Sequence, residues 1–270
     1  MQGRVVVVTG AAQGLGEATA RLLSWRGAAG LVLVDRNREL GEAVAAELDN
    51  AECPTTFVAA ELSQPDDCAA VIDHVDERFG VVHGVVNCAA VTDRGTVWDT
   101  TVELWDLMLD VNVRAPFLLM QGAARIMRRE AVPGSMVTIG SMTGHGGQPI
   151  LLPYAVSKGA LSTMTKNLAY SLMRDRIRVN QVNLGWMDTP TEDRIQRQYH
   201  DAGDDWLARA EADQPFGQLL KTNEVARVLC FLLSDESGLM TGAIIDLAQT
   251  VLGAGDPIHP PSEPFRTFEH

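Results

Sequence analysis

The sequence lacks the features that mark several large classes of protein. Its 22 Lys and Arg residues are outnumbered by 35 Asp and Glu residues, and the net charge of −13 repels phosphate backbones and anionic lipid surfaces. No apolar run reaches the roughly 18 residues that a transmembrane helix needs. The chain has four cysteines without a CxxC pair, so no zinc or disulfide framework is indicated. These absences argue against a nucleic-acid-binding, membrane-bound or disulfide-stabilised protein.

The composition instead favours one large globular domain in a reducing compartment. Hydrophobic residues make up 46% of the 270 residues, which is enough for a single well-buried core. The N-terminal sequence passes directly from Met1–Arg4 into the apolar run Val5–Val8, without the segments of a secretory signal. We therefore expect a cytoplasmic protein whose cysteines are small buried residues.

Short β-branched runs alternate with longer amphipathic stretches along most of the chain. This alternation predicts an α/β fold, namely a single-domain Rossmann fold with a doubly wound, parallel, seven-stranded sheet. The expected strands are Val5–Thr9, Leu31–Asp35, Thr55–Ala60, Gly84–Asn87, Ser135–Gly140, Arg178–Leu184 and Ala243–Leu247. The expected helices are Leu15–Arg26, Glu39–Leu48, Pro65–Phe79, Leu104–Arg129, Pro153–Met173 and Asn223–Leu233.

Two segments interrupt this alternation. Residues 188–218 are polar and longer than an ordinary connection, so we expect a lid that contains short helices. Residues 253–270 contain four prolines and are expected to form an extended tail. The predicted domain organisation is a dehydrogenase-like Rossmann domain over residues 1–252, followed by that tail.

A glycine-rich turn follows the first predicted strand and opens a helix. Gly10, Gly14 and Gly16 can supply a tight turn, backbone access for a pyrophosphate and close helix packing. Asp35 ends the second predicted strand, where a carboxylate can accept hydrogen bonds from both ribose hydroxyls of an adenosine. Its charge disfavours a 2′-phosphate, which favours NAD over NADP. Arg36 leaves this open, because a guanidinium can bind that phosphate or stack on adenine.

The sequence Tyr154-Ala-Val-Ser-Lys158 opens another predicted helix. Residues four apart share a helix face, so the ammonium of Lys158 is expected near the phenol of Tyr154. A nearby positive charge lowers the pKa of a tyrosine and suits it to exchange a proton with an alcohol. Ser141 ends the fifth strand, where doubly wound sheets bind ligands. Asn112 falls inside a predicted helix, where it is either an ordinary polar residue or a polar kink that holds a water near Lys158.

With these motifs the chain resembles the short-chain dehydrogenase/reductase (SDR) family over residues 3–250. Thr9–Gly16 resembles the family's TGxxxGxG turn, and Asp35 resembles its NAD-selecting acid. The residues that match its catalytic tetrad in order and spacing are Asn112, Ser141, Tyr154 and Lys158. The resemblance implies that Tyr154 is the acid/base, that Lys158 lowers its pKa and binds the nicotinamide ribose, that Ser141 positions the substrate, and that Asn112 holds a relay water.

The same resemblance implies a set of residues that bind NAD. They are Gly10, Gln13, Gly14, Leu15, Gly16, Asp35, Arg36, Glu61, Leu62, Asn87, Tyr154, Lys158, Gly185, Met187 and Thr189. Four positions depart from the family pattern without removing a proton-transfer group. Cys88 and Ala90 replace the second asparagine and the final glycine of NNAG, Glu61 replaces an aspartate, and Leu184 replaces a proline.

Other functions fit the sequence less well. Residues Gly140–Gly144 lack the GxSxG nucleophile elbow of a serine hydrolase. The six histidines are scattered singly, so we expect no metal. A non-catalytic nucleotide sensor on the same fold has no need for Tyr154 and Lys158 together. An NADP(H)- or NAD(H)-dependent reductase of a small ketone remains an alternative.

The substrate is expected beside the segment that follows Ser141. Thr143, His145 and Gln148 offer hydrogen-bonding groups there, which favours a sugar or polyol over an apolar substrate. Arg94 can bind an anionic substituent. The lid residues Trp186, Met187 and Trp206 favour an apolar ligand instead, although aromatic side chains also stack on sugar faces. We therefore expect NAD-dependent oxidation of a sugar or polyol hydroxyl. The apolar surface of Leu104–Arg129 and Pro153–Met173 predicts a homotetramer or homodimer.

Overall fold

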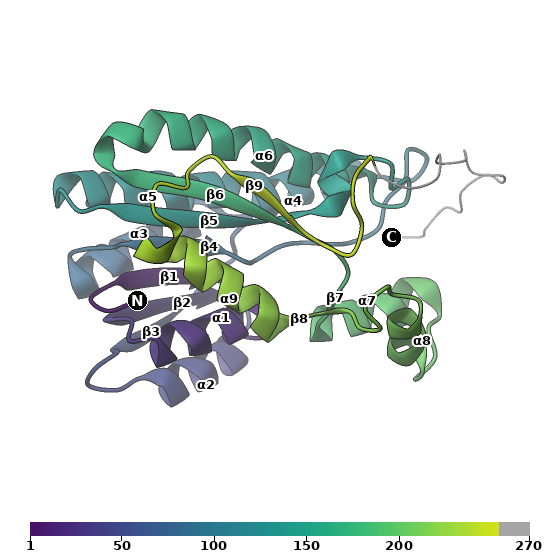
Figure 1. Cartoon of the computed structure of the whole chain (residues 1–270), viewed down its shortest axis with the longest axis horizontal. Coiled ribbons are helices and arrows are strands. Elements are labelled where there is room, and N and C mark those ends of the chain that lie inside the picture. The colour runs from purple at the N-terminus through teal and green to yellow at the C-terminus, as the bar shows by residue number, and fades with distance from the viewer. Residues whose placement is uncertain (254–270) are drawn as a thin grey trace.

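The computed structural model describes residues 1–253, so the predicted extended tail beyond Gly253 lies outside the described part. Its centre is a seven-stranded parallel sheet with the order β3-β2-β1-β4-β5-β6-β9 (Figure 1). These strands are β1 (Val5–Thr9), β2 (Gly30–Asp35), β3 (Thr55–Ala59), β4 (Gly84–Asn87), β5 (Gly134–Ser141), β6 (Ile177–Leu184) and β9 (Ile244–Leu247). The predicted sheet is confirmed, and each strand end lies within one residue of the predicted end.

Helices cover both faces of the sheet, as its continuous apolar strands require. One face carries α1 (Gly14–Trp25), α2 (Arg38–Leu48) and α9 (Thr222–Leu233). The other carries α3 (Pro65–Phe79), α5 (Ala115–Arg129) and α6 (Leu152–Leu172), with α4 (Val102–Leu109) packed against α6.

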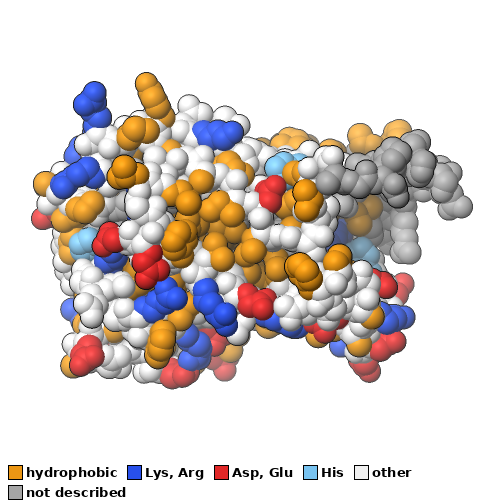
Figure 2. Space-filling model, in the orientation of Figure 1, with side chains coloured by type: hydrophobic (Ala, Val, Ile, Leu, Met, Phe, Trp, Pro, Cys, Tyr) orange, Lys and Arg blue, Asp and Glu red, His pale blue; other side chains and the backbone are white. Residues whose placement is uncertain are grey.

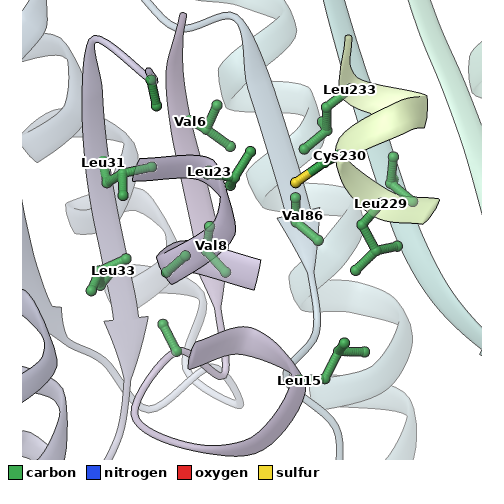
Figure 3. Packing of buried hydrophobic residues seen from close by; sticks show 14 of the residues in the cluster. Val6, Val8, Leu15, Leu23, Leu31, Leu33, Val86, Leu229, Cys230 and Leu233 are labelled. Atoms are coloured by element: carbon green, nitrogen blue, oxygen red, sulfur yellow. The ribbon is translucent and has the colours of Figure 1, made fainter. Parts of the chain in front are cut away.

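The two hydrophobic cores follow from the alternation of side chains along each strand. Val6 and Val8 of β1 belong to one core, whereas Val7 between them belongs to the core on the opposite face. Figure 3 shows Val6 and Val8 beside Leu23 of α1, with the α9 side chains next to them. Because these strands are buried on both faces, the sheet holds the carboxyl ends of its strands in fixed positions.

The predicted helix Leu104–Arg129 is present and begins two residues earlier, but a π-helical turn interrupts its α-helical geometry. The structure has α4, then a π-helical segment over Asp110–Arg114, and then α5. Asn112 lies in this π segment, and its side chain binds the backbone of Val91 instead of solvent. The helix geometry therefore changes at the position where a polar kink was considered, and a tertiary contact of Asn112 accompanies the change.

The segment after β6 forms a small lobe beside the carboxyl ends of the strands (Figure 1). It contains α7 (Pro190–His200) and α8 (Trp206–Ala212), in agreement with the expected short helices. The two-residue strands β7 (Met187–Asp188) and β8 (Leu220–Lys221) pair in parallel, which the sequence did not predict. Trp206, Ala210 and Leu219 form a separate small core in this lobe.

Figure 2 shows hydrophobic side chains gathered on the molecular face over β9 and α9.

No helix within residues 1–253 is both long and apolar enough to cross a membrane. In the same residues, no group of His, Cys, Asp or Glu side chains has the arrangement of a metal site.

Candidate active site

A cavity of about 1330 Å³ opens at the carboxyl ends of the parallel strands. Its wall includes Gly10 after β1, Asp35 at the end of β2, Cys88 after β4 and Ser141 at the end of β5. The strand order reverses between β1 and β4, because β1 pairs with β2 on one side and with β4 on the other. Doubly wound sheets bind their ligands at such a switch point.

The glycine-rich turn forms one side of this cavity. Gly10 and Gly14 have positive φ angles of 66° and 61°. A Cβ on Gly10 would lie 2.8 Å from the nitrogen of Ala89, and a Cβ on Gly16 would lie 2.1 Å from the Gly10 oxygen. Helix α1 begins here, and its N-cap residue Gln13 makes no side-chain cap. The free N–H groups and positive end of α1 are therefore available to an anion such as a pyrophosphate.

Asp35 lies where a ribose-binding carboxylate is expected. Its two oxygens accept hydrogen bonds from the backbone nitrogens of Ala12, at 3.1 Å, and Asn37, at 2.9 Å. These bonds hold the carboxylate in the cavity wall, and each oxygen retains a lone pair for a ligand. Arg36 beside it is exposed and makes no ion pair within the described residues.

The remaining expected cofactor residues surround the same space. Those in the cavity wall are Gln13, Gly14, Leu15, Gly16, Glu61, Leu62, Gly185, Met187 and Thr189. Asn87 is different, because it is 4% exposed and does not line the cavity. Within residues 1–253 neither polar atom of its side chain has a hydrogen-bond partner. The uncapped helix, the glycine turn and the acidic Asp35 together fit an adenine dinucleotide.

Tyr154 and Lys158 lie together on α6 and face the cavity. The Lys158 nitrogen is 5.5 Å from the centre of the Tyr154 ring. Lys158 is 3% exposed, and its ammonium donates a hydrogen bond of 2.7 Å to the carbonyl of Ile139. The geometry therefore agrees with the predicted pairing on one helix face.

The electrostatics of this pair differ from the expectation. Loss of hydration raises the pKa of Tyr154 to about 12, although a hydrogen bond from Ser141 and the charge of Arg94 act in the opposite direction. Loss of hydration also lowers the pKa of Lys158 to about 8. The expected lowering of the tyrosine pKa by Lys158 is wrong for this structure, because burial outweighs the favourable charges. The phenol is therefore protonated at neutral pH.

Ser141 is positioned by its own loop. Its hydroxyl oxygen accepts hydrogen bonds from the backbone nitrogen of Thr143, at 3.2 Å, and from the hydroxyl of Thr143, at 2.9 Å. The same hydroxyl also interacts with the phenol of Tyr154 and acts to lower its pKa. Ser141, Tyr154 and Lys158 thus share one wall of the cavity, so an oxygen atom bound there can meet both hydroxyl groups.

Asn112 lies behind this wall rather than in it. Its amide nitrogen donates to the carbonyl of Val91, at 2.9 Å, and to the hydroxyl of Ser157, at 3.1 Å. Its amide oxygen accepts from the backbone nitrogen of Val91, at 2.8 Å. Asn112 therefore joins the loop after β4 to helix α6, next to Lys158.

Four of the five expected substrate residues line the cavity, and one does not. The four are Arg94, Thr143, Gln148 and Trp186. His145 instead contacts Asp246 of β9 at 3.2 Å and Asn183 of β6 at 3.3 Å. The expectation that His145 faces the pocket is wrong, because the short 3₁₀ turn after Ser141 carries it toward the edge strand.

Helix α7 contributes Glu192 and further residues to the cavity wall, and these were not predicted from the sequence. Glu192 accepts hydrogen bonds from the indole of Trp186, at 2.8 Å, and from Gln196, at 2.7 Å. The pattern Thr189-Pro-Thr-Glu192 was a usable signal, because it has the spacing of a capping box. Thr189 does cap the helix by accepting from the Glu192 nitrogen.

Comparison with known proteins identifies the family. A family model described as enoyl-(acyl carrier protein) reductase matches residues 10–248. The chain is 30% identical over 247 residues to 3-oxoacyl-(acyl-carrier-protein) reductase of Thermotoga maritima, covering 92% of this chain and 97% of the relative. It is 32% identical over 241 residues to 3-alpha-(or 20-beta)-hydroxysteroid dehydrogenase of Mycobacterium bovis, covering 89% of this chain and 86% of that protein.

A solved structure agrees with these relatives. The 3-ketoacyl-(acyl-carrier-protein) reductase of Brucella melitensis complexed with NADH has a TM-score of 0.80 and 28% identity, covering 91% of this chain and 97% of the other. The predicted family resemblance and fold are both confirmed. The chain therefore belongs to the short-chain dehydrogenase/reductase family, and it is an oxidoreductase that acts on hydroxyl or keto groups with a nucleotide cofactor.

Proposed function

We propose that this protein oxidises a secondary or anomeric hydroxyl of a sugar or polyol and uses NAD. The observation that carries the proposal is the single cavity that joins Asp35 and the glycine turn to the hydroxyl groups of Ser141 and Tyr154. The glycine turn and Asp35 would hold NAD, which would supply the acceptor for a hydride from the carbon that bears the substrate hydroxyl. Asp35 supports NAD because its charge repels a 2′-phosphate.

The chain's own residues handle the proton and the substrate oxygen. Ser141 holds the substrate oxygen beside Tyr154, and the phenol oxygen of Tyr154 exchanges a proton with it. The ammonium of Lys158 is held near the ring of Tyr154, where it would bind a ribose hydroxyl of the cofactor. Asn112 links the loop at Val91 to Ser157, and a relay water beside it would continue the proton path from Lys158.

Two features of the cavity support a polar, hydroxylated substrate. Thr143 and Gln148 place hydrogen-bonding groups in the wall, and these would be left unpaired by an apolar ligand. Trp186 stacks on Trp206 with a centroid distance of 6.2 Å, and it is 41% exposed. An exposed indole in a cavity wall offers a flat face to a sugar ring.

Reduction of a small ketone is a second candidate direction, and one observation favours it. The pKa of Tyr154 is raised to about 12, so the phenol holds its proton at neutral pH. A protonated phenol donates to a carbonyl oxygen, whereas oxidation of an alcohol needs the phenolate.

Purified protein assayed with NAD and NADP against aldoses, polyols, cyclic alcohols and the matching ketones tests the proposal. We expect turnover of at least one hydroxylated substrate, with NAD preferred. Turnover confined to steroids or acyl thioesters would contradict the substrate class, and preference for NADP would contradict the cofactor.

We also propose that the protein is a homotetramer in the cytoplasm. Exposed apolar side chains on α4, α5 and α6 support the assembly, among them Val102, Phe117, Val156 and Tyr170. The four cysteines are unpaired, in keeping with a reducing compartment. Light scattering that gives a monomer of 29.2 kDa at micromolar concentration would contradict the assembly.

A further inference from the structure

Arg94 is a buried cation in the wall of the cavity, on the loop that follows β4. It is 7% exposed, and its charge acts to lower the pKa of Tyr154, although less than burial raises that pKa. A guanidinium removed from water is costly unless a charge or hydrogen bonds compensate it. The partners of Arg94 therefore indicate what its site is built to bind.

The protein satisfies Arg94 only in part. The Nε group donates to Nε2 of His200 at 3.3 Å, and Nη1 donates to the carbonyl of Thr92 at 3.0 Å. A guanidinium has five N–H donors, so three are left, and two of them lie on the outer edge formed by Nη1 and Nη2. Within residues 1–253, Nη2 makes no hydrogen bond and Arg94 makes no ion pair.

The carboxylates nearest to Arg94 are already engaged elsewhere. Asp93 accepts a hydrogen bond from the hydroxyl of Tyr199 at 2.9 Å. Glu192 accepts from Trp186 and Gln196 on its own lobe. Both act on Arg94 through space, but neither approaches within the 4.0 Å of an ion pair. Loss of hydration lowers the pKa of Arg94 by more than these two carboxylates raise it.

We propose that Arg94 binds a carboxylate of the substrate, so that the molecule oxidised at Tyr154 is a hydroxy acid. The two free N–H groups on the outer edge of the guanidinium match the two oxygens of a carboxylate, which is the pairing that Arg makes best. This inference rests on the proposed dehydrogenase function and narrows its substrate from neutral sugars and polyols to hydroxylated acids. The corresponding product is a keto acid, or a lactone after anomeric oxidation.

Matched pairs of substrates test this proposal directly. The pairs are lactate with 1,2-propanediol, 3-hydroxybutyrate with 1,3-butanediol, and galacturonate with galactose. Each pair exchanges a carboxylate for a hydroxymethyl group, and the three pairs differ in the separation between hydroxyl and carboxylate. We expect kcat/KM for the acid to exceed that for its neutral partner at least tenfold in one or more pairs.

Variants of Arg94 test whether this residue causes the preference for acids over neutral substrates. Arg94→Gln should reduce the acid-to-neutral ratio to near one, and Arg94→Lys should retain part of it. The ratio is the useful quantity, because a change in the pKa of Tyr154 affects both members of a pair equally. Arg194→Gln is the matched control: it removes an exposed positive charge from the same cavity wall and should leave the ratio intact.

A binding measurement covers the case in which Arg94 variants fold poorly. Titration of the parent protein saturated with NADH should give affinity for propionate and none for propionamide. Equal binding of the two together with equal use of every pair would overturn the carboxylate proposal, as would an unchanged ratio in Arg94→Gln. Oxidation of the neutral substrates as fast as the acids would contradict the role of Arg94 but would agree with the dehydrogenase function. Binding of propionate with no turnover of any member would instead contradict the dehydrogenase function.

Discussion

The ammonium nitrogen of Lys158 lies 5.5 Å from the centre of the Tyr154 ring, and it donates its hydrogen bond to the carbonyl of Ile139. The two groups are close, yet burial changes the pKa of each more than their mutual contact does. The pKa of Tyr154 rises to about 12 and that of Lys158 falls to about 8. At neutral pH the site therefore contains a protonated phenol beside an ammonium group whose pKa of about 8 is close to the pH.

Replacement of Tyr154 by phenylalanine removes the proton-transfer group while keeping the ring. We expect turnover to fall at least about a hundredfold, the scale for loss of a positioned acid or base. Affinity for the nucleotide should change little, because the glycine turn and Asp35 are untouched. Steady-state kinetics and a nucleotide titration measure the two effects. Turnover within a few-fold of the parent would refute the role of Tyr154.

Glu192→Gln should make oxidation faster near neutral pH. The charge of Glu192 raises the pKa of Tyr154, so its removal lowers that pKa. Oxidation needs the phenolate, and its rate rises about tenfold per pH unit below the tyrosine pKa. The rise in log kcat/KM should therefore shift to lower pH in the variant.

Asp193→Asn is the control for Glu192→Gln, because Asp193 lies on the same helix but binds Arg197 and Trp206. It should leave the pH profile where it is. A profile that is unchanged in Glu192→Gln, or that shifts equally in both variants, would contradict the electrostatic link to Tyr154.

Lys158→Met should stabilise the protein more at pH 7 than at pH 9.5. The pKa of Lys158 is about 8 in the folded chain and about 10.4 in the unfolded chain. Between these values the unfolded chain holds a proton that the folded chain has released, so stability of the parent rises with pH. The variant lacks this dependence. The effect of the substitution on the unfolding free energy should differ by about 2 kcal/mol between the two pH values.

Urea unfolding of parent and Lys158→Met at both pH values measures this effect. Loss of the hydrogen bond to Ile139 destabilises the variant equally at the two pH values, so the change with pH isolates the charge. A difference in unfolding free energy that stays constant with pH would show that Lys158 is not destabilised by burial.

Asp35→Ser should raise kcat/KM with NADP and lower it with NAD. The carboxylate can accept bonds from both ribose hydroxyls, each worth roughly 1.5–3 kcal/mol, and it repels an added phosphate. Its loss leaves Arg36 as the charged side chain beside the ribose site. Melting temperatures control for the lost bonds to Ala12 and Asn37. A parent that prefers NADP would show that Arg36 governs the choice.

Residues 188–218 should exchange their amide hydrogens faster than strand β5 when no ligand is bound. This lobe has its own small core of Trp206, Ala210 and Leu219, separate from the two large cores. A segment that buries little apolar area opens more easily. Nucleotide and substrate should slow its exchange, as expected for a lid. Protection equal to that of β5 without ligand would make the lobe a fixed subdomain.

Most strands and helices of the sheet domain can be predicted from short stretches of the sequence. The runs Val5–Thr9 and Gly84–Asn87 are apolar at every position but the last, and such runs form strands buried on both faces. The geometry of the glycine turn and the pairing of Tyr154 with Lys158 also depend only on residues that are close together in the sequence. Residues a few positions apart are placed by the geometry of one turn or one helix, so their relation can be inferred without the fold.

Other features depend on contacts between distant segments. The π segment at Asn112 accompanies bonds to Val91 and Ser157, 21 and 45 residues away. His145 contacts Asp246 across 101 residues, and Arg94 meets His200 across 106. The sequence alone determined the family's fold, its nucleotide turn and its catalytic spacing. Only the tertiary structure decided which side chains enter the pocket and how burial changes their pKa values, because both depend on neighbours that folding brings together and on the water that it removes.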